Sequence, residues 1–184
     1  MIYENLLFII LHIKTVMQFP ILTTERLILR CLEPNDAPAL KTLRSNKSVN
    51  QFLDRPKSTT LRAAQRFIQN ILFLINSQQS FYWGIALKEN NLVIGTICYW
   101  NLNPNENQAE IGYELHPKFQ GKGMMQEAVL KILEYGWNEM QLKTITAFTR
   151  FDNLKSIALL EKFNFQQIID TKESQYKCYA LKKQ

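Results

Sequence analysis

Apolar residues follow two spacings along the chain, and these spacings predict which segments form strands and which form helices. Strict alternation, and short apolar runs bounded by turn residues, indicate strands. Strands are expected at residues 21–31, 81–87, 92–100, 109–115, 143–149, 165–169 and 176–181. Apolar residues three and four positions apart indicate a helix that packs on a sheet. This stripe is clearest at Leu61, Ala64, Ile68, Ile71 and Ile75.

Helices and turns are expected between these strands. The four expected helices begin after a cap at Asn35 or Asp36, after Thr59 or Thr60, near Gly123 and near Asn153. Residues 47–58 are expected to form a loop. A turn at residues 88–91 joins the second and third strands as a hairpin, and Gly95 inside the third strand indicates a bulge or a close backbone approach.

The order of these elements predicts the fold class. A helix separates the fourth and fifth strands, so this pair can run parallel, whereas strands joined by turns run antiparallel. We therefore expect an α/β (α+β) domain with one mixed, mostly antiparallel sheet of about seven strands, flanked by four helices. The 184 residues suffice for one domain with a sizeable core, and no internal repeat divides them.

The formal net charge of +6 fits a solvated basic surface, a polyphosphate ligand or nucleic acid. No run of lysines and arginines is longer than two residues, which disfavours nucleic acid as a partner. Trp83, Tyr99 and Trp100 could stack on bases, but aromatic residues within strands are more often part of a core. We expect no nucleic-acid partner.

The number and spacing of the cysteines indicate the cellular compartment, and the number of histidines excludes a zinc motif. Cys31, Cys98 and Cys178 are far apart and odd in number, which fits reduced thiols in the cytoplasm. His12 and His116 are the only histidines, so no zinc motif can be assembled. We expect a cytoplasmic protein that uses no metal.

The first residues differ from the rest of the chain. Residues 6–13 form an apolar run that is too short to span a bilayer and lacks the flanks of a signal peptide. We expect residues 1–16 to be an N-terminal extension of uncertain status and residues 17–184 to be a single domain. The extension either precedes a natural start at Met17 or packs on the domain or a partner subunit. No membrane partner is expected.

The segment from Gln120 to Met125 lies between an expected strand and an expected helix. A helix start presents unpaired backbone N–H groups and the positive end of the helix dipole. Gly121 and Gly123 allow close approach of a pyrophosphate, and Lys122 adds positive charge. The turn matches neither a nucleotide P-loop nor a dinucleotide fingerprint. By themselves, these residues fit both a phosphate-binding turn and an ordinary strand-to-helix turn.

This segment resembles the acetyl-coenzyme A signature of the GNAT N-acetyltransferase superfamily, which reads Gln or Arg, two residues, Gly, one residue, then Gly or Ala. Gln120 and Gly123 match it, and Met125 departs at the last position. The resemblance covers the start of the RimJ/RimL-like branch (residues 22–30), its fourth strand (109–115), and its last helix and exit turn (153–165). Asn164 stands where the family usually has glycine, and asparagine is the next-best residue for a left-handed helix terminus.

The resemblance implies an N-acetyltransferase that moves the acetyl group of acetyl-coenzyme A to a primary amine by direct transfer in a ternary complex. The residues implied to bind the coenzyme are Leu115, Gln120, Gly121, Lys122, Gly123, Met124, Met125 and Asn153. None of the cysteines has a histidine-paired context, so we expect no acetyl-cysteine intermediate.

Two residues are the candidates for catalysis, Glu110 and Ser156. An amine must lose a proton before it attacks a thioester, and a nearby carboxylate can accept that proton. Glu110 is the candidate general base, and strand alternation puts Glu114 on the same face; either carboxylate could instead only pair with a basic residue. By resemblance, Ser156 could serve the departing thiolate, or it is a small residue that allows close packing. A backbone N–H near residues 113–115 is implied to stabilise the oxyanion.

The acceptor is left open by the sequence. The RimJ/RimL-like branch includes enzymes that acetylate the N-terminal amine of ribosomal proteins, so such an amine is one expected partner. A polyamine, amino sugar or antibiotic is the alternative, with Asp54 and Glu173 in the two loops that build the acceptor pocket of this fold. A non-catalytic coenzyme-binding module is a third reading, and a homodimer is also left open.

Overall fold

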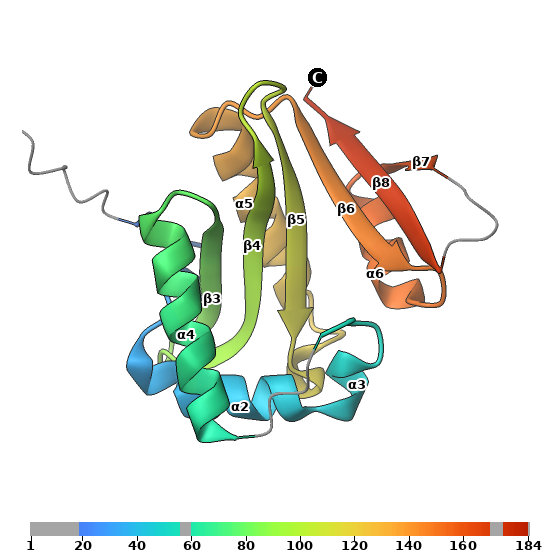
Figure 1. Cartoon of the computed structure of the whole chain (residues 1–184). Helices are drawn as coiled ribbons and strands as arrows, with labels where there is room; N and C mark the ends of the chain where they lie inside the picture. The colour runs from blue at the N-terminus through green and yellow to red at the C-terminus, as the bar shows by residue number, and fades with distance from the viewer. Residues whose placement is uncertain (1–18, 56–59, 170–174, 184) are drawn as a thin grey trace, which may run out of the picture.

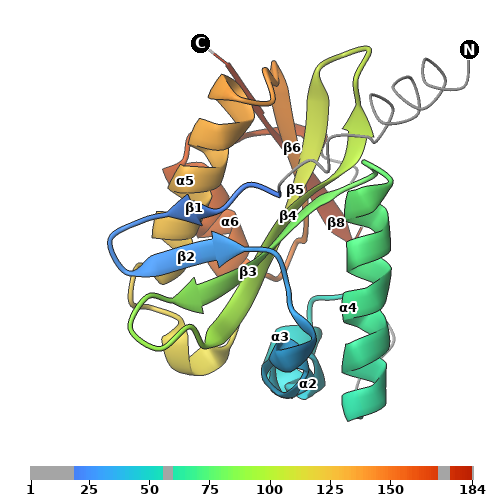
Figure 2. The same ribbon diagram turned by 90° about the vertical axis from the view of Figure 1, so that its left-hand side faces the viewer.

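The protein folds around one mixed sheet. The computed structural model describes residues 19–55, 60–169 and 175–183 of the chain. Within the described residues eight strands pair in the order β1-β2-β3-β4-β5-β6-β8-β7 (Figure 1 labels β3 to β8, and Figure 2 labels β1 and β2). The strands are β1 (Leu22–Thr23), β2 (Leu27–Arg30), β3 (Phe81–Leu87), β4 (Val93–Asn103), β5 (Gln108–Leu115), β6 (Thr144–Arg150), β7 (Gln166–Ile169) and β8 (Tyr176–Lys182). The β5–β6 pair is parallel and the other pairs are antiparallel, which confirms the predicted fold class. The expected extension at residues 1–16 lies outside the described residues.

Helices cover both faces of the sheet (Figure 2). They are α2 (Ala37–Ser45), α3 (Lys47–Asn50), α4 (Leu61–Asn76), α5 (Met124–Asn138) and α6 (Leu154–Lys162), with short 3-10 helices η1 (Pro34–Asp36) and η2 (Pro117–Phe119). One core, which includes Trp83, Tyr99 and Ile132, joins the sheet to α5 and α6. A second core, which includes Leu40 and Ile68, joins it to α2 and α4. No described helix has the length and apolar character needed to cross a bilayer.

The α4 helix forms as its apolar stripe predicts. Ala64, Ile68 and Ile71 are buried, and the Oγ1 of Thr60 accepts the backbone N–H of Ala63 at 3.1 Å as an N-cap. Leu61, at the start of the stripe, is 44% exposed. The stripe therefore identified the packed face correctly, except at its first turn.

The prediction of one strand over residues 21–31 is wrong, because the chain reverses direction within it. β1 and β2 pair with each other as a hairpin, which adds a strand to the expected seven or so. The hydroxyl oxygen of Thr24 accepts the N–H of Leu27 at 3.0 Å, and Glu127 of α5 accepts the backbone N–H of Arg26 at 2.8 Å. These contacts fix the turn, and the partner Glu127 is remote in sequence.

The prediction that residues 47–58 form a loop is also partly wrong. The four-residue helix α3 occupies its start, so the described residues hold five α-helices rather than four. The Oδ1 of Asn46 accepts the N–H groups of Ser48 at 3.0 Å and Val49 at 3.4 Å. A helix this short presents no repeating apolar stripe, so hydrophobic spacing does not reveal it.

A glycine within a strand predicted a bulge or a close backbone approach at Gly95. The structure shows that β5 lies close to β4 at this residue. A Cβ at this position would lie 2.4 Å from the backbone oxygen of Glu114. We expect Gly95→Ala to lower the free energy of unfolding by about 1–3 kcal/mol, measured by chemical denaturation, because β5 must shift to admit the methyl group. Gly112→Ala is the control, since its Cβ would meet the Cys98 sulfur at 3.2 Å, a side-chain atom that can move. Equal losses in the two variants would contradict this expectation.

The strands β5 and β6 pair over only three residues and then separate. Gln108, Ala109 and Glu110 pair with residues 144–146, whereas β6 continues beside β8 to Arg150. Figure 1 shows the two strands diverging below this point. The separation leaves the second half of β5 with an edge that has none of the described strands beside it.

Candidate active site

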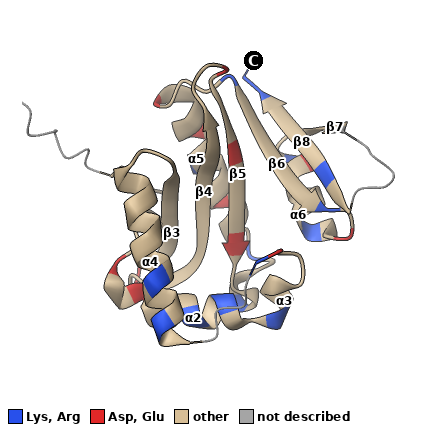
Figure 3. Cartoon of the chain, in the orientation of Figure 1, with Lys and Arg blue, Asp and Glu red and all other residues tan. Residues whose placement is uncertain are grey.

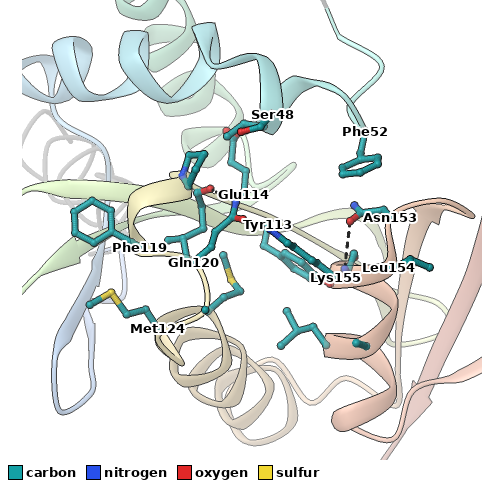
Figure 4. A pocket seen from close by; sticks show the side chains of 18 of the residues that line it. Ser48, Phe52, Tyr113, Glu114, Phe119, Gln120, Met124, Asn153, Leu154 and Lys155 are labelled. Carbon is teal, nitrogen blue, oxygen red and sulfur yellow. Dashed lines mark hydrogen bonds between the residues drawn. The ribbon is translucent and has the colours of Figure 1, made fainter.

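A cavity of about 960 Å³ lies beside the open end of β5. Its walls come from α3 and the segment after it, from β5, from the turn before α5, from the first turn of α5, and from the length of α6. In Figure 4, Ser48 and Phe52 lie on one side of the cavity and Met124 of α5 on the other, with Asn153 of α6 closing one end. Eight of the ten predicted site residues line it: Leu115, Gln120, Gly121, Gly123, Met124, Met125, Asn153 and Ser156.

The turn before α5 has a left-handed backbone at both of its glycines. Gly121 and Gly123 have φ values of +74° and +76°, a left-handed conformation that side chains disfavour. Gly123 is the N-cap of α5, so the free N–H groups of this helix start at the cavity wall. A Cβ built on Gly121 would meet nothing within 4 Å, so the space above the turn is open. The geometry suits an anion that approaches the backbone closely.

Gln120 ties the turn to its two neighbours. Its Nε2 donates to the backbone oxygen of Leu115 at 2.9 Å, and its Oε1 accepts from the Nζ of Lys155 at 3.1 Å. From the other side, Arg26 donates to the backbone oxygen of Lys122 at 3.0 Å. The turn is thereby held between β5, α6 and the β1–β2 hairpin.

The positive charge of the cavity comes from residues that the sequence did not single out. Lys122 is not among the lining residues, and its Nζ lies 5.9 Å from the centroid of the Phe119 ring. Lys155 and Lys162 of α6 line the cavity instead. Lys162 donates to the side chain of Gln126 at 2.8 Å, which places its charge beside the first turn of α5.

The open edge of β5 presents backbone groups toward the gap between β5 and β6. His116 donates its backbone N–H to Ile94 of β4 at 2.8 Å, so strand alternation turns the backbone groups of Leu115 and Tyr113 away from β4. The Leu115 oxygen accordingly meets Gln120. The N–H groups of these two residues are positioned to bind a ligand carbonyl, as a further strand would.

Ser156 is held in a polar pair with Tyr113. The Tyr113 hydroxyl and the Ser156 Oγ are 2.9 Å apart, and both residues line the cavity. Asn153 caps α6 by accepting the backbone N–H of Ser156 at 3.3 Å, which confirms the expected cap. Burial raises the pKa of Tyr113 to about 12, although the hydrogen bond with Ser156 opposes this shift. The phenol therefore keeps its proton at neutral pH.

The two carboxylates of β5 share a face but have different surroundings. Register with β4 is unbroken from Glu110 to Glu114, so both point to the same side. Glu114 lines the cavity and pairs with Arg55 at 2.5 Å. Glu110 is 8% exposed, is not among the lining residues, and accepts from the Nδ2 of Asn101 at 2.8 Å. Burial raises the pKa of Glu110 above its usual value, against the effect of its hydrogen bonds.

The cysteines are free thiols. Burial raises the pKa of Cys98 to about 12, and it raises the pKa values of Cys31 and Cys178 as well. None of the three lines the cavity. Among the described residues, no three His, Cys, Asp or Glu side chains come together as a metal site would require.

Comparison with known proteins decides the family. Residues 26–166 match the family model described as Acetyltransferase (GNAT) domain. The chain belongs to this GNAT family. The uncharacterized N-acetyltransferase YoaA of Bacillus subtilis (strain 168) is 34% identical over 149 residues, which are 81% of this chain and 84% of YoaA. The uncharacterized N-acetyltransferase p20 of Bacillus licheniformis is 38% identical over 147 residues, 79% and 82% of the two chains. This GNAT protein is therefore an N-acetyltransferase.

A solved structure of the GNAT fold confirms the architecture. It is named as RimL, a ribosomal L7/L12 alpha-N-protein acetyltransferase in complex with coenzyme A. It superposes with a TM-score of 0.80 over 89% of this chain and 98% of its own, at 22% identity. At this identity the likeness shows the shared fold.

Proposed function

We propose that this protein transfers the acetyl group of acetyl-coenzyme A to a primary amine, directly and within a ternary complex. The observation that carries the proposal is the junction of two features at one cavity. The left-handed glycine turn before α5 offers N–H groups to phosphates, and the open edge of β5 offers N–H groups to amides or a carbonyl. An acyl donor that has both a pyrophosphate and amide groups fits this pair.

The residues that would hold the coenzyme follow from these features. The backbone of Gly121, Gly123 and Met124 would bind the pyrophosphate, and Lys155 and Lys162 would balance its charge. Leu115 would pair with the pantetheine amides, with Asn153 beside them. Lys122 would act from the rim of the cavity, because it is not among the residues that line it. Acetyl-coenzyme A, when bound, would supply a thioester that is activated for attack.

The protein's own groups would then handle charge and protons. As the amine nitrogen forms its bond to the acetyl carbon, the carbonyl oxygen becomes negative, and the N–H of Tyr113 or Leu115 can donate to it. As the carbon–sulfur bond breaks, the hydroxyl of Ser156 can donate its proton to the sulfur. Ser156 can then recover a proton from the Tyr113 hydroxyl, and solvent returns a proton to Tyr113. The amine would lose its proton to water, or through water to Glu110, which does not itself line the cavity.

The acceptor proposed first is the N-terminal amine of a protein, including a ribosomal protein. The support is the name of the superposed RimL structure, whose fold this chain shares. A small-molecule amine is the second candidate, because the cavity wall beside Phe52 and Leu53 could enclose one. We further propose a cytoplasmic location and a single catalytic domain over residues 17–184.

Thiol release from acetyl-coenzyme A, measured over a panel of acceptors, tests the proposal. The panel holds peptides with a free N-terminal Ala or Ser, polyamines and aminoglycosides. Turnover on peptides supports the first acceptor, and turnover on small amines alone selects the second. Tight binding of the coenzyme without turnover on any amine contradicts the proposed reaction.

Replacing Glu110 with glutamine tests the general base. A base accepts a proton only when ionised, so kcat/KM should rise with pH through the raised pKa of Glu110. We expect Glu110→Gln to lower kcat by about tenfold or more and to remove this acid limb from the pH–rate profile. Glu106→Gln, at an exposed turn, is the control. An unchanged acid limb in Glu110→Gln would assign the limb to another group.

A further inference from the structure

The tip of the β1–β2 hairpin is bound to the first turn of α5 through the carboxylate of Glu127 (Figure 2). This carboxylate accepts from the backbone N–H of Arg26 at 2.8 Å, from the Arg26 Nε at 2.7 Å, and from the hydroxyl of Thr24. Burial alone would raise the pKa of Glu127, but the hydrogen bonds from Thr24 and Arg26 lower it below its usual value. Glu127 therefore stays ionised at neutral pH and holds the guanidinium of Arg26 in place.

The guanidinium of Arg26 also reaches the glycine turn before α5. Its Nη1 donates to the backbone oxygen of Lys122 at 3.0 Å, and its Nη2 would lie 3.5 Å from a Cβ built on Gly123. The Arg26 side chain is 43% exposed, and an ion pair at such a surface adds little to the free energy of unfolding. The main consequence of these contacts is therefore expected in the geometry of the turn.

The contact between Arg26 and Lys122 fixes the direction of one peptide group. In a trans peptide, the carbonyl of one residue and the N–H of the next point in opposite directions. Because the Lys122 oxygen is directed to Arg26, the N–H of Gly123 points away from the hairpin. Among the described residues, no backbone oxygen accepts this N–H. Gly123 lines the cavity and Arg26 does not, so the N–H is left for an anion at the start of α5.

Gly123 does not fix this direction by itself. Glycine adopts positive and negative φ about equally well, so its φ of +76° has an alternative in which the peptide between Lys122 and Gly123 is reversed. The reversed peptide would present the Lys122 oxygen to the cavity in place of an N–H. Two negative groups repel each other, so a phosphate would bind poorly to that conformation. A contact from outside the turn has to select the favourable direction, and Arg26 makes one.

We propose that Arg26 is a positioning residue of the coenzyme site. It holds the Lys122 carbonyl toward the β1–β2 hairpin and so keeps the Gly123 N–H directed at the pyrophosphate, while Glu127 holds Arg26. The inference rests on the proposed acetyl transfer for the identity of the ligand. Because Arg26 acts through the turn, its loss should weaken coenzyme binding and leave the chemistry at the thioester unchanged.

Arg26→Met tests the inference, because it keeps an unbranched side chain and removes the donors. We expect the Kd of coenzyme A, measured by calorimetric titration, and the KM for acetyl-coenzyme A to rise about tenfold, as loss of a charged hydrogen bond implies. The kcat and the KM for the amine should stay within about twofold of the parent values. Glu127→Gln should raise the same Kd, because a neutral amide holds the guanidinium less firmly. An unchanged Kd in Arg26→Met would overturn the inference.

Two control variants separate this role from hairpin stability and from charge in general. Lys88→Gln loosens the same hairpin tip, since the Lys88 Nζ donates to the backbone oxygen of Thr24 at 2.5 Å and to no described residue of the glycine turn. Arg62→Gln removes an exposed positive charge from the start of α4, where Figure 3 shows basic residues. Both variants should keep the parent Kd. If Lys88→Gln raises the Kd as much as Arg26→Met does, the effect belongs to hairpin stability, and the inference fails.

A spectroscopic measurement without coenzyme keeps this inference distinct from the proposed reaction. The scalar couplings between the amide and α-protons of Gly123 report its φ, and Arg26→Met should change them by releasing the peptide. The couplings of Gly84 in β3 should stay at the parent values. If the parent binds no coenzyme A but the Gly123 couplings change, the proposed reaction fails and the positioning role is retained. If the parent turns over amines but Arg26→Met changes neither the couplings nor the Kd, the reaction is retained and the inference fails.

Discussion

Gly123→Val is expected to raise the KM for acetyl-coenzyme A by roughly 30-fold, with a smaller change in the KM for the amine. Gly123 has φ +76° and ends the turn whose N–H groups start α5 at the cavity wall. A β-branched residue disfavours this conformation by about 2 kcal/mol, which corresponds to ~30-fold in an equilibrium constant. Its methyl groups would also stand where a pyrophosphate must approach the backbone. Steady-state kinetics and calorimetric titration of coenzyme A measure the effect.

A matched control exists elsewhere in the chain. Asn164, at the end of α6, has φ +60° and does not line the cavity. Asn164→Val imposes a similar backbone strain, so it should lower the melting temperature while leaving the KM for acetyl-coenzyme A nearly unchanged. If both variants raise that KM equally, the effect belongs to stability, and the glycine turn has no special part in binding.

Hydrophobic spacing predicted the parts of the fold in which local pattern and packing agree. The stripe of α4 and the helix between β5 and β6 are repeated local signals, and both were confirmed. The β1–β2 hairpin was missed because Glu127, more than a hundred positions away along the chain, fixes its turn. The α3 helix was missed because one Asn46 cap, and no stripe, specifies it.

The candidate site was predictable where conformation follows from residue type. Gly121 and Gly123 were expected to allow a ligand close to the backbone, and both have positive φ and line the cavity. Lys122 was expected in the cavity because it adjoins the glycines, but neighbours along a turn point in different directions, and Lys155 of α6 lies there instead. Glu114 pairs with Arg55 and Arg44, which are 59 and 70 residues before it in the sequence. Only the folded chain brings these residues together.

Ser156 and Tyr113 are expected to act on the leaving sulfur as one unit, which a double-mutant cycle can measure. If Ser156 donates to the sulfur, Ser156→Ala should lower kcat by roughly 10- to 100-fold, at the lower end of general-acid effects because a thiolate leaves readily. Tyr113→Phe removes the hydroxyl that lies 2.9 Å from the Ser156 Oγ, so it should lower kcat less.

The double variant distinguishes a shared role from two separate ones. Because Tyr113 is expected to act through Ser156, Tyr113→Phe should cost almost nothing in a chain that already carries Ser156→Ala. The KM for acetyl-coenzyme A should stay close to the parent value, since Asn153 and the glycine turn remain. Tyr82→Phe is the control, because it removes a buried hydroxyl bonded to Thr96 on β4 and not to Ser156. Fully additive losses of kcat would instead mean that the two hydroxyls act independently. An unchanged kcat in Ser156→Ala would mean that solvent, and not Ser156, protonates the thiolate.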